Sequence, residues 1–130
     1  MTPRVSCVAL GLTVVLGLTM ACSLLSTGPA ATVSRFYGLL EKGKIEDAQK
    51  LLSSRVVGQL GTAKMRAALE AGAQDISKKQ GIRDIKVQKE EIQGDLASVT
   101  VLITYGNGST DTENAKLVKE RGSWKLDISK

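Results

Sequence analysis

The sequence predicts an α+β fold in which three N-terminal helices pack on a four-stranded antiparallel sheet. Apolar residues recur with helical spacing between residues 29 and 80, and from residue 82 onward the spacing changes to the alternation of strands. Glycine-containing turns divide this second half into segments that suit hairpins. Because helices and strands are segregated along the chain, we expect the helices to cover an antiparallel sheet in one domain.

The three helices are expected at residues 29–43, 44–52 and 62–80. Pro29 suits the first turn of a helix, where a missing N–H group costs no intrahelical bond, and Gly43 is typical just past a helix end. Thr62 is the expected N-cap of the third helix. The apolar faces consist of Val33, Phe36, Tyr37 and Leu40; Ile45, Ala48, Leu51 and Leu52; and Met65, Ala68, Leu69, Ala73 and Ile76.

Four strands are expected from residue 82 on, with turns at residues 94–95, 106–109 and 121–123. The clearest strand covers residues 96–105, where the apolar side chains that point one way are Val99, Val101, Ile103 and Tyr105. In the last strand Trp124, Leu126 and Ile128 are expected to point inward. The C-terminal strand is therefore predicted to belong to the core.

Residues 1–21 are predicted to be a signal peptide. Arg4 is the only charge of this segment, and residues 5–20 form an almost uninterrupted apolar and small-residue run. The run then fades into polar residues at 23–28, which favours cleavage over a spanning helix of about 20 apolar residues. A permanent single-span anchor is the alternative.

The residues Leu18-Thr19-Met20-Ala21-Cys22 resemble the lipobox of bacterial lipoproteins. Cleavage between Ala21 and Cys22 would leave Cys22 as the only cysteine, without an internal disulfide partner. The resemblance implies acylation of Cys22, with diacylglycerol and palmitate, and residues 22–28 as a tether to a bacterial membrane. In a Gram-negative source, Ser23 after the cysteine resembles lipoproteins sent to the outer membrane, where the domain would face the periplasm.

The composition argues against several classes of function. The chain has no histidine, which removes the commonest general base and metal ligand, so we expect no metal, no cofactor and no enzymatic activity. The net charge is +5, and aromatic residues make up 3% of the chain, which does not suit nucleic-acid binding. Asp111 and Glu113 follow a hairpin loop and are expected to meet solvent.

Two stretches resemble a known group of proteins: residues 29–48, PAATVSRFYGLLEKGKIEDA, and residues 119–127, KERGSWKLD. They are similar to small bacterial lipoproteins of unknown function, sometimes given the label lumazine-binding, in the nuclear-transport-factor-two-like or SnoaL-like superfamily. The resemblance implies one domain at residues 29–130, with a curved sheet wrapped around a long helix as a cone, a cystatin-like roll. The cone-mouth residues that a ligand would contact are then Tyr37, Val101, Ile103 and Tyr105.

The leading expectation is a membrane-anchored envelope lipoprotein with a non-enzymatic domain that binds a small apolar ligand or a protein partner. The first alternative is a structural module that forms a homodimer through its open sheet face, which would bury Val99, Val101 and Ile103. The second is an enzyme of isomerase or hydratase type that uses Tyr37 or Tyr105. A fold of this kind does not by itself decide between them.

Overall fold

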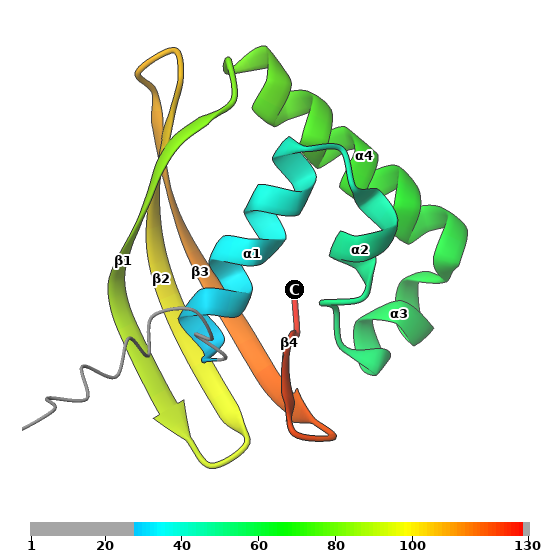
Figure 1. Cartoon of the computed structure of the whole chain (residues 1–130). Helices are drawn as coiled ribbons and strands as arrows, with labels where there is room; N and C mark the ends of the chain where they lie inside the picture. Colours follow the sequence, from blue (N-terminus) through cyan, green and yellow to red (C-terminus); the bar gives the residue numbers. More distant parts are fainter. Residues whose placement is uncertain (1–27, 129–130) are drawn as a thin grey trace, which may run out of the picture.

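The structure, a computed structural model, describes residues 28–128 (Figure 1). Four helices precede four strands along the chain, and the sheet has the order β1-β2-β3-β4 with antiparallel neighbours. The sheet is curved, and the helices lie on one side of it, with α1 against its concave face (Figure 1). The predicted α+β class and the curved four-stranded sheet are confirmed.

The helices are α1 (Pro29–Glu41), α2 (Ile45–Gln49), α3 (Ser54–Leu60) and α4 (Thr62–Lys78). The prediction of three helices was wrong in number, because α3 lies between the second and third predicted helices, in a stretch to which no element was assigned. It begins at the N-cap Ser53, whose Oγ accepts a hydrogen bond from the backbone N–H of Val56 at 3.2 Å. Thr62 is the first residue of α4 and not its N-cap, a position that Gly61 occupies.

The strands are β1 (Ile82–Gln93), β2 (Leu96–Tyr105), β3 (Thr110–Glu120) and β4 (Ser123–Leu126). The strand predicted at residues 96–105 agrees with β2 at both ends. The prediction that Ile128 points inward was wrong: β4 ends at Leu126, and Ile128 is 59% exposed. The chain leaves the alternation at Asp127, whose side chain contacts Ser53 and Arg55 of another element.

The hydrophobic core lies between the concave face of the sheet and the helices. Val99, Val101 and Ile103 of β2 are completely buried, as is Val33 of α1. Trp124 and Leu126 are also buried, so the expected contribution of β4 to the core is confirmed. Because helices already cover the β2 stripe, it is not available as the interface of a homodimer.

Candidate functional site

A polar cluster, Lys79 with Asp75, Asp111 and Tyr105, lies where the end of α4 meets the hairpin between β2 and β3. The backbone N–H groups of Gly106 and Asn107 donate to the carbonyls of Gly81 and Lys79, at 2.9 and 3.0 Å. These bonds hold the hairpin loop against the helix end. The lysine therefore reaches the strands from a fixed backbone position.

Lys79 is the centre of this cluster. Its Nζ lies 2.8 Å from Asp111 Oδ2 and 3.0 Å from Asp75 Oδ2. It also lies 4.5 Å from the centre of the Tyr105 ring, which is a cation–π contact. Asp111 is thus an ion-pair partner rather than the freely solvated carboxylate that the sequence suggested, although its side chain is still 42% exposed.

The pKa shifts of Lys79, Asp111 and Tyr105 move these three groups away from neutrality. Hydrogen bonding from Lys79, and then from the Tyr105 hydroxyl, lowers the pKa of Asp111, and the same carboxylate raises the pKa of Lys79. Burial is the largest cause of the raised pKa of Tyr105, and likewise of Tyr37, where the Glu113 carboxylate adds to it. Since a general acid or base works best with a pKa near the operating pH, this cluster is poorly suited to proton transfer.

The four predicted cone-mouth residues divide into two groups. Tyr37 is half-buried and Tyr105 is buried, and the Tyr105 hydroxyl is one of the neighbours that add to the raised pKa of Tyr37. Val101 and Ile103 have no exposed surface, so in this structure they pack in the core and do not line an opening. The mouth is accordingly a polar rim over a filled interior.

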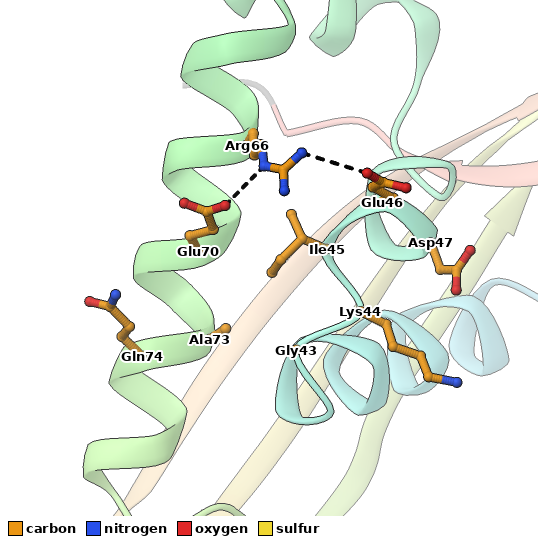
Figure 2. Close-up of a pocket in the computed structure, with 9 residues that line it drawn as sticks. All are labelled: Gly43, Lys44, Ile45, Glu46, Asp47, Arg66, Glu70, Ala73 and Gln74. Carbon is orange, nitrogen blue, oxygen red and sulfur yellow. Dashed lines mark hydrogen bonds and ion pairs between the residues drawn. The ribbon is translucent and has the colours of Figure 1, made fainter.

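A groove between α2 and α4 was not anticipated from the sequence (Figure 2). Its volume is about 630 Å³, and its lining residues are Gly43, Lys44, Ile45, Glu46, Asp47, Arg66, Glu70, Ala73 and Gln74. Arg66 bridges the walls, with its Nε 2.9 Å from Glu70 Oε1 and its Nη1 3.6 Å from Glu46 Oε1. Helical spacing places Arg66, Glu70 and Gln74 on one face of α4, but only the tertiary structure sets them opposite α2.

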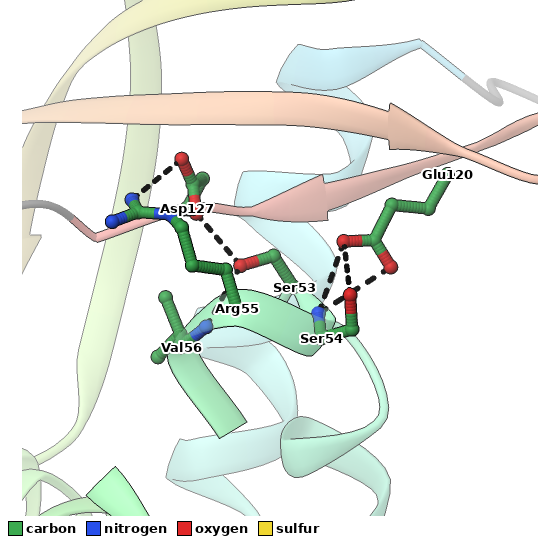
Figure 3. A network of polar contacts seen from close by, with 6 residues as sticks. All are labelled: Ser53, Ser54, Arg55, Val56, Glu120 and Asp127. Carbon is green, nitrogen blue, oxygen red and sulfur yellow. Dashed lines mark hydrogen bonds and ion pairs between the residues drawn. The ribbon is translucent and has the colours of Figure 1, made fainter. Parts of the chain in front are cut away.

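A second polar network joins the C-terminal segment to α3 (Figure 3). Asp127 accepts hydrogen bonds from Ser53 Oγ at 2.7 Å and from Arg55 Nε at 3.0 Å, while Arg55 Nη2 lies 2.7 Å from its other oxygen. Glu120 accepts from the backbone N–H and the hydroxyl of Ser54. Ser53 is completely buried, so its hydroxyl is structural and has no access to a substrate.

The predicted cleavage site, Ala21 and Cys22, lies outside the described residues, as does the rest of the predicted signal peptide and tether up to residue 27. Among the helices of residues 28–128, none has the length and apolar character that crossing a membrane requires. Within the same part of the chain, no group of three or more His, Cys, Asp or Glu side chains is arranged to hold a metal ion.

Comparison with known proteins supports the fold. A protein from Campylobacter jejuni, provisionally named an NTF2-like transpeptidase, is similar over 78% of this chain and 99% of its own, with a TM-score of 0.67 and 19% identity. The SEC-C motif containing protein RPA3114 from Rhodopseudomonas palustris is similar over 78% of this chain and 77% of its own, with a TM-score of 0.57 and 13% identity. At these identities the likeness concerns the fold alone.

No curated protein matches the sequence significantly. The sequence model of a family described as a domain of unknown function, DUF4878, matches residues 21–127, which is most of the chain. The chain therefore belongs to the DUF4878 family, and its domain has the NTF2-like fold.

Proposed function

We propose that the protein is a bacterial envelope lipoprotein, anchored through acylated Cys22, whose NTF2-like domain is a non-enzymatic binding module for a protein partner. One observation favours a protein partner over a small ligand, namely the difference between two surfaces in openness and polarity. The inner face of the sheet is filled, with Val101 and Ile103 completely buried, whereas the groove between α2 and α4 is open and polar. A buried apolar ligand would need the first surface, and a polypeptide suits the second.

The chemistry of the groove favours a segment with mixed charges. Lys44 and Arg66 contribute positive charge, and the carboxylates come from Glu46, Asp47 and Glu70. Ile45 is buried at the base, with 9% of its surface exposed, and offers a small apolar contact. The Arg66 side chain is 55% exposed, so its ion pairs with Glu46 and Glu70 are weak. Charged groups of a partner can therefore replace them at small cost in free energy.

The absence of a catalytic role is part of the proposal. The chain has no histidine, and Tyr37, Tyr105 and Asp111 have pKa values displaced from neutrality. If the enzymatic alternative were correct, Tyr37→Phe would remove a turnover while the fold stayed intact.

Binding at the groove is tested by photo-crosslinking in the source cells. A benzoylphenylalanine at Gln74, on the groove, is expected to crosslink to one defined protein, and the same probe at the exposed Gln59 of α3 serves as the matched control. Charge reversal by Glu70→Lys should abolish the crosslink without changing the melting temperature. Equal crosslinking from both positions, or a crosslink that survives the charge reversal, would contradict the groove as the binding site.

A small apolar ligand is the second candidate, and one observation favours it. A cavity of about 310 Å³ at the end of the sheet is lined in part by Leu96, Ala97 and Leu117, and it falls at the lower limit of usual ligand sites. Native mass spectrometry of the purified protein would reveal a bound apolar compound. A ligand of this kind should also raise the melting temperature by mass action.

Anchoring is tested independently of binding. We expect the protein to fractionate with membranes and to resist extraction with high salt, because a protein with two or more acyl chains in the bilayer dissociates far more slowly than one with a single chain. Cys22→Ala should move the protein to the soluble fraction or leave its precursor unprocessed. If the Cys22→Ala protein remained on membranes with a processed N-terminus, lipid anchoring at this residue would be refuted.

A further inference from the structure

The direction of α1 fixes where the N-terminal segment leaves the domain. A Cβ atom added to Gly28, just before α1, would lie 4.0 Å from Glu90 Oε1 on β1. At the other end of the helix, Glu41 Oε1 accepts a hydrogen bond from the backbone N–H of Ile82 at 3.0 Å. The helix therefore runs from the Gln93 end of β1 to its Ile82 end, and the preceding residues join the domain near the former.

The same end of the domain carries two hairpin turns. The turn between β1 and β2 lies at Gly94 and Asp95, and the carbonyl of Asp95 accepts a hydrogen bond from the backbone N–H of Lys119 at 2.7 Å. Lys119 is near the end of β3, so the turn between β3 and β4 comes directly after this bond along the chain. Gly122 of that turn and Ala31, in the first turn of α1, line the same surface hollow. Figure 1 shows both turns at the lower end of the sheet, on the side where α1 begins.

The turn between β1 and β2 is flanked by exposed apolar side chains. Ile92 is 52% exposed and Leu96 is 60% exposed, although both are large aliphatic residues. Ile92 is opposite Ala97 and therefore points to the core face of the sheet, whereas Leu96 is opposite Gln93 and points to the outer face. Single exposed leucines are common, but here the tip of one hairpin presents apolar surface on both of its faces.

We propose that this hairpin tip, residues 92–96, contacts the bilayer surface, with Ile92 and Leu96 at the boundary between headgroups and acyl chains. This inference rests on the proposed acylation of Cys22. Six residue steps separate Cys22 from Gly28, so the anchor lies within about 20 Å of Gly28. The tip lies only three residues beyond Glu90, or about 10 Å along the strand. The Ile82 end lies eight residues away, about 26 Å, on the side opposite the membrane.

The charges around the tip indicate which force drives this contact. Lys89 is paired with Glu91 at 3.0 Å, and Asp95 of the turn is bonded through its backbone carbonyl to Lys119, a residue of opposite charge. Positive and negative groups are therefore interspersed, and there is no single-sign patch of the kind that anionic headgroups attract. We expect apolar burial to dominate, so the contact should depend little on the fraction of anionic lipid.

The test uses the full, lipidated chain with one introduced thiol, because Cys22 is blocked by acylation and Cys7 is removed with the signal peptide. An environment-sensitive dye is attached at Leu96→Cys, or at the neighbouring Gln93→Cys, and in the control at the exposed Lys78→Cys at the end of α4. Each protein is reconstituted in vesicles of phosphatidylethanolamine with a minor share of phosphatidylglycerol. Flotation with the vesicles measures anchoring, and quenching by brominated acyl chains measures the depth of the dye.

We expect all labelled proteins to float, and the dyes at residues 93 and 96 to be quenched several-fold more than the dye at residue 78. Flotation with equal quenching at both ends would overturn the membrane-facing tip and leave the proposed anchoring intact. Loss of flotation would refute both. A third outcome is a change in dye fluorescence that depends on how densely the protein covers the vesicles and is the same with and without brominated lipid. That result would assign the tip to a contact with a second copy of the chain and would also overturn the inference.

Discussion

Replacement of Asp127 by alanine should destabilise the domain strongly, even though the residue follows the last strand. Its carboxylate accepts a hydrogen bond from Ser53 Oγ at 2.7 Å, and Ser53 is completely buried. Without this carboxylate the Ser53 oxygen still accepts from the Val56 N–H group, but its buried proton has no acceptor, and an unsatisfied buried donor costs about 1–3 kcal/mol. The ion pair with Arg55 adds less, because that guanidinium is 45% exposed.

A loss of about 2 kcal/mol corresponds to a fall of roughly 8–16 °C in melting temperature for a domain of this size. The assay is urea unfolding followed by the fluorescence of Trp124, in which the midpoint should fall while the slope stays unchanged. Asp47→Ala is the control, because its ion pair with Lys50 at 3.2 Å lies on the exposed surface, and its effect should stay within about 0.5 kcal/mol.

A double-mutant cycle with Ser53→Ala tests the cause of the effect. If the unpaired hydroxyl is responsible, Asp127→Ala should cost much less in the Ser53→Ala background, with a coupling of about 1 kcal/mol or more. Additive losses would refute this reasoning. A loss below about 0.5 kcal/mol for Asp127→Ala alone would refute it as well.

Three further predictions concern pH, the core and one turn. Because the pKa of Asp127 is lowered on folding, its contribution to stability is present above about pH 4 and is lost as the pH falls through the folded-state pKa. Since the chain has no histidine, the free energy of unfolding measured in urea titrations should be nearly constant between about pH 5.5 and 8.5. Ile103→Asp should yield unfolded protein, not a folded monomer, by circular dichroism, since that side chain is completely buried. Gly106→Ala should lower stability by on the order of 2 kcal/mol, because its Cβ would lie 2.1 Å from the Gln80 carbonyl oxygen, whereas Gly38→Ala, with no atom within 4 Å, should be neutral or stabilising in thermal melts.

The elements that could be predicted from the sequence are those specified by local pattern. Residues 96–105 place apolar side chains at every second position from Ala97 to Tyr105, with only Leu96 and Leu102 apolar on the other side, and β2 has these bounds. Pro29 marks the first residue of α1 for a similarly local reason. The helix α3 was missed because seven residues that include Gly58 are too few for a convincing period. Ser53 ahead of Val56 was the available N-cap signal.

The candidate sites depend on contacts between residues far apart in the sequence. Asp127 meets Ser53 across 74 positions, and Lys79 meets Asp111 across 32. No local pattern specifies either pair. The error at Ile128 has the same origin, since the alternation continues in the sequence while tertiary contacts turn the chain away after Leu126. The groove between α2 and α4 exists only because the two helices pack together.

The mass of the mature N-terminal peptide tests most directly the claim that this NTF2-like domain acts from a membrane. Protein purified from the source membranes is digested, and the peptide is sequenced by mass spectrometry, with Cys22→Ala as the control. The account predicts a peptide that begins at Cys22 and carries acyl chains. An unmodified peptide that begins at another residue would contradict it.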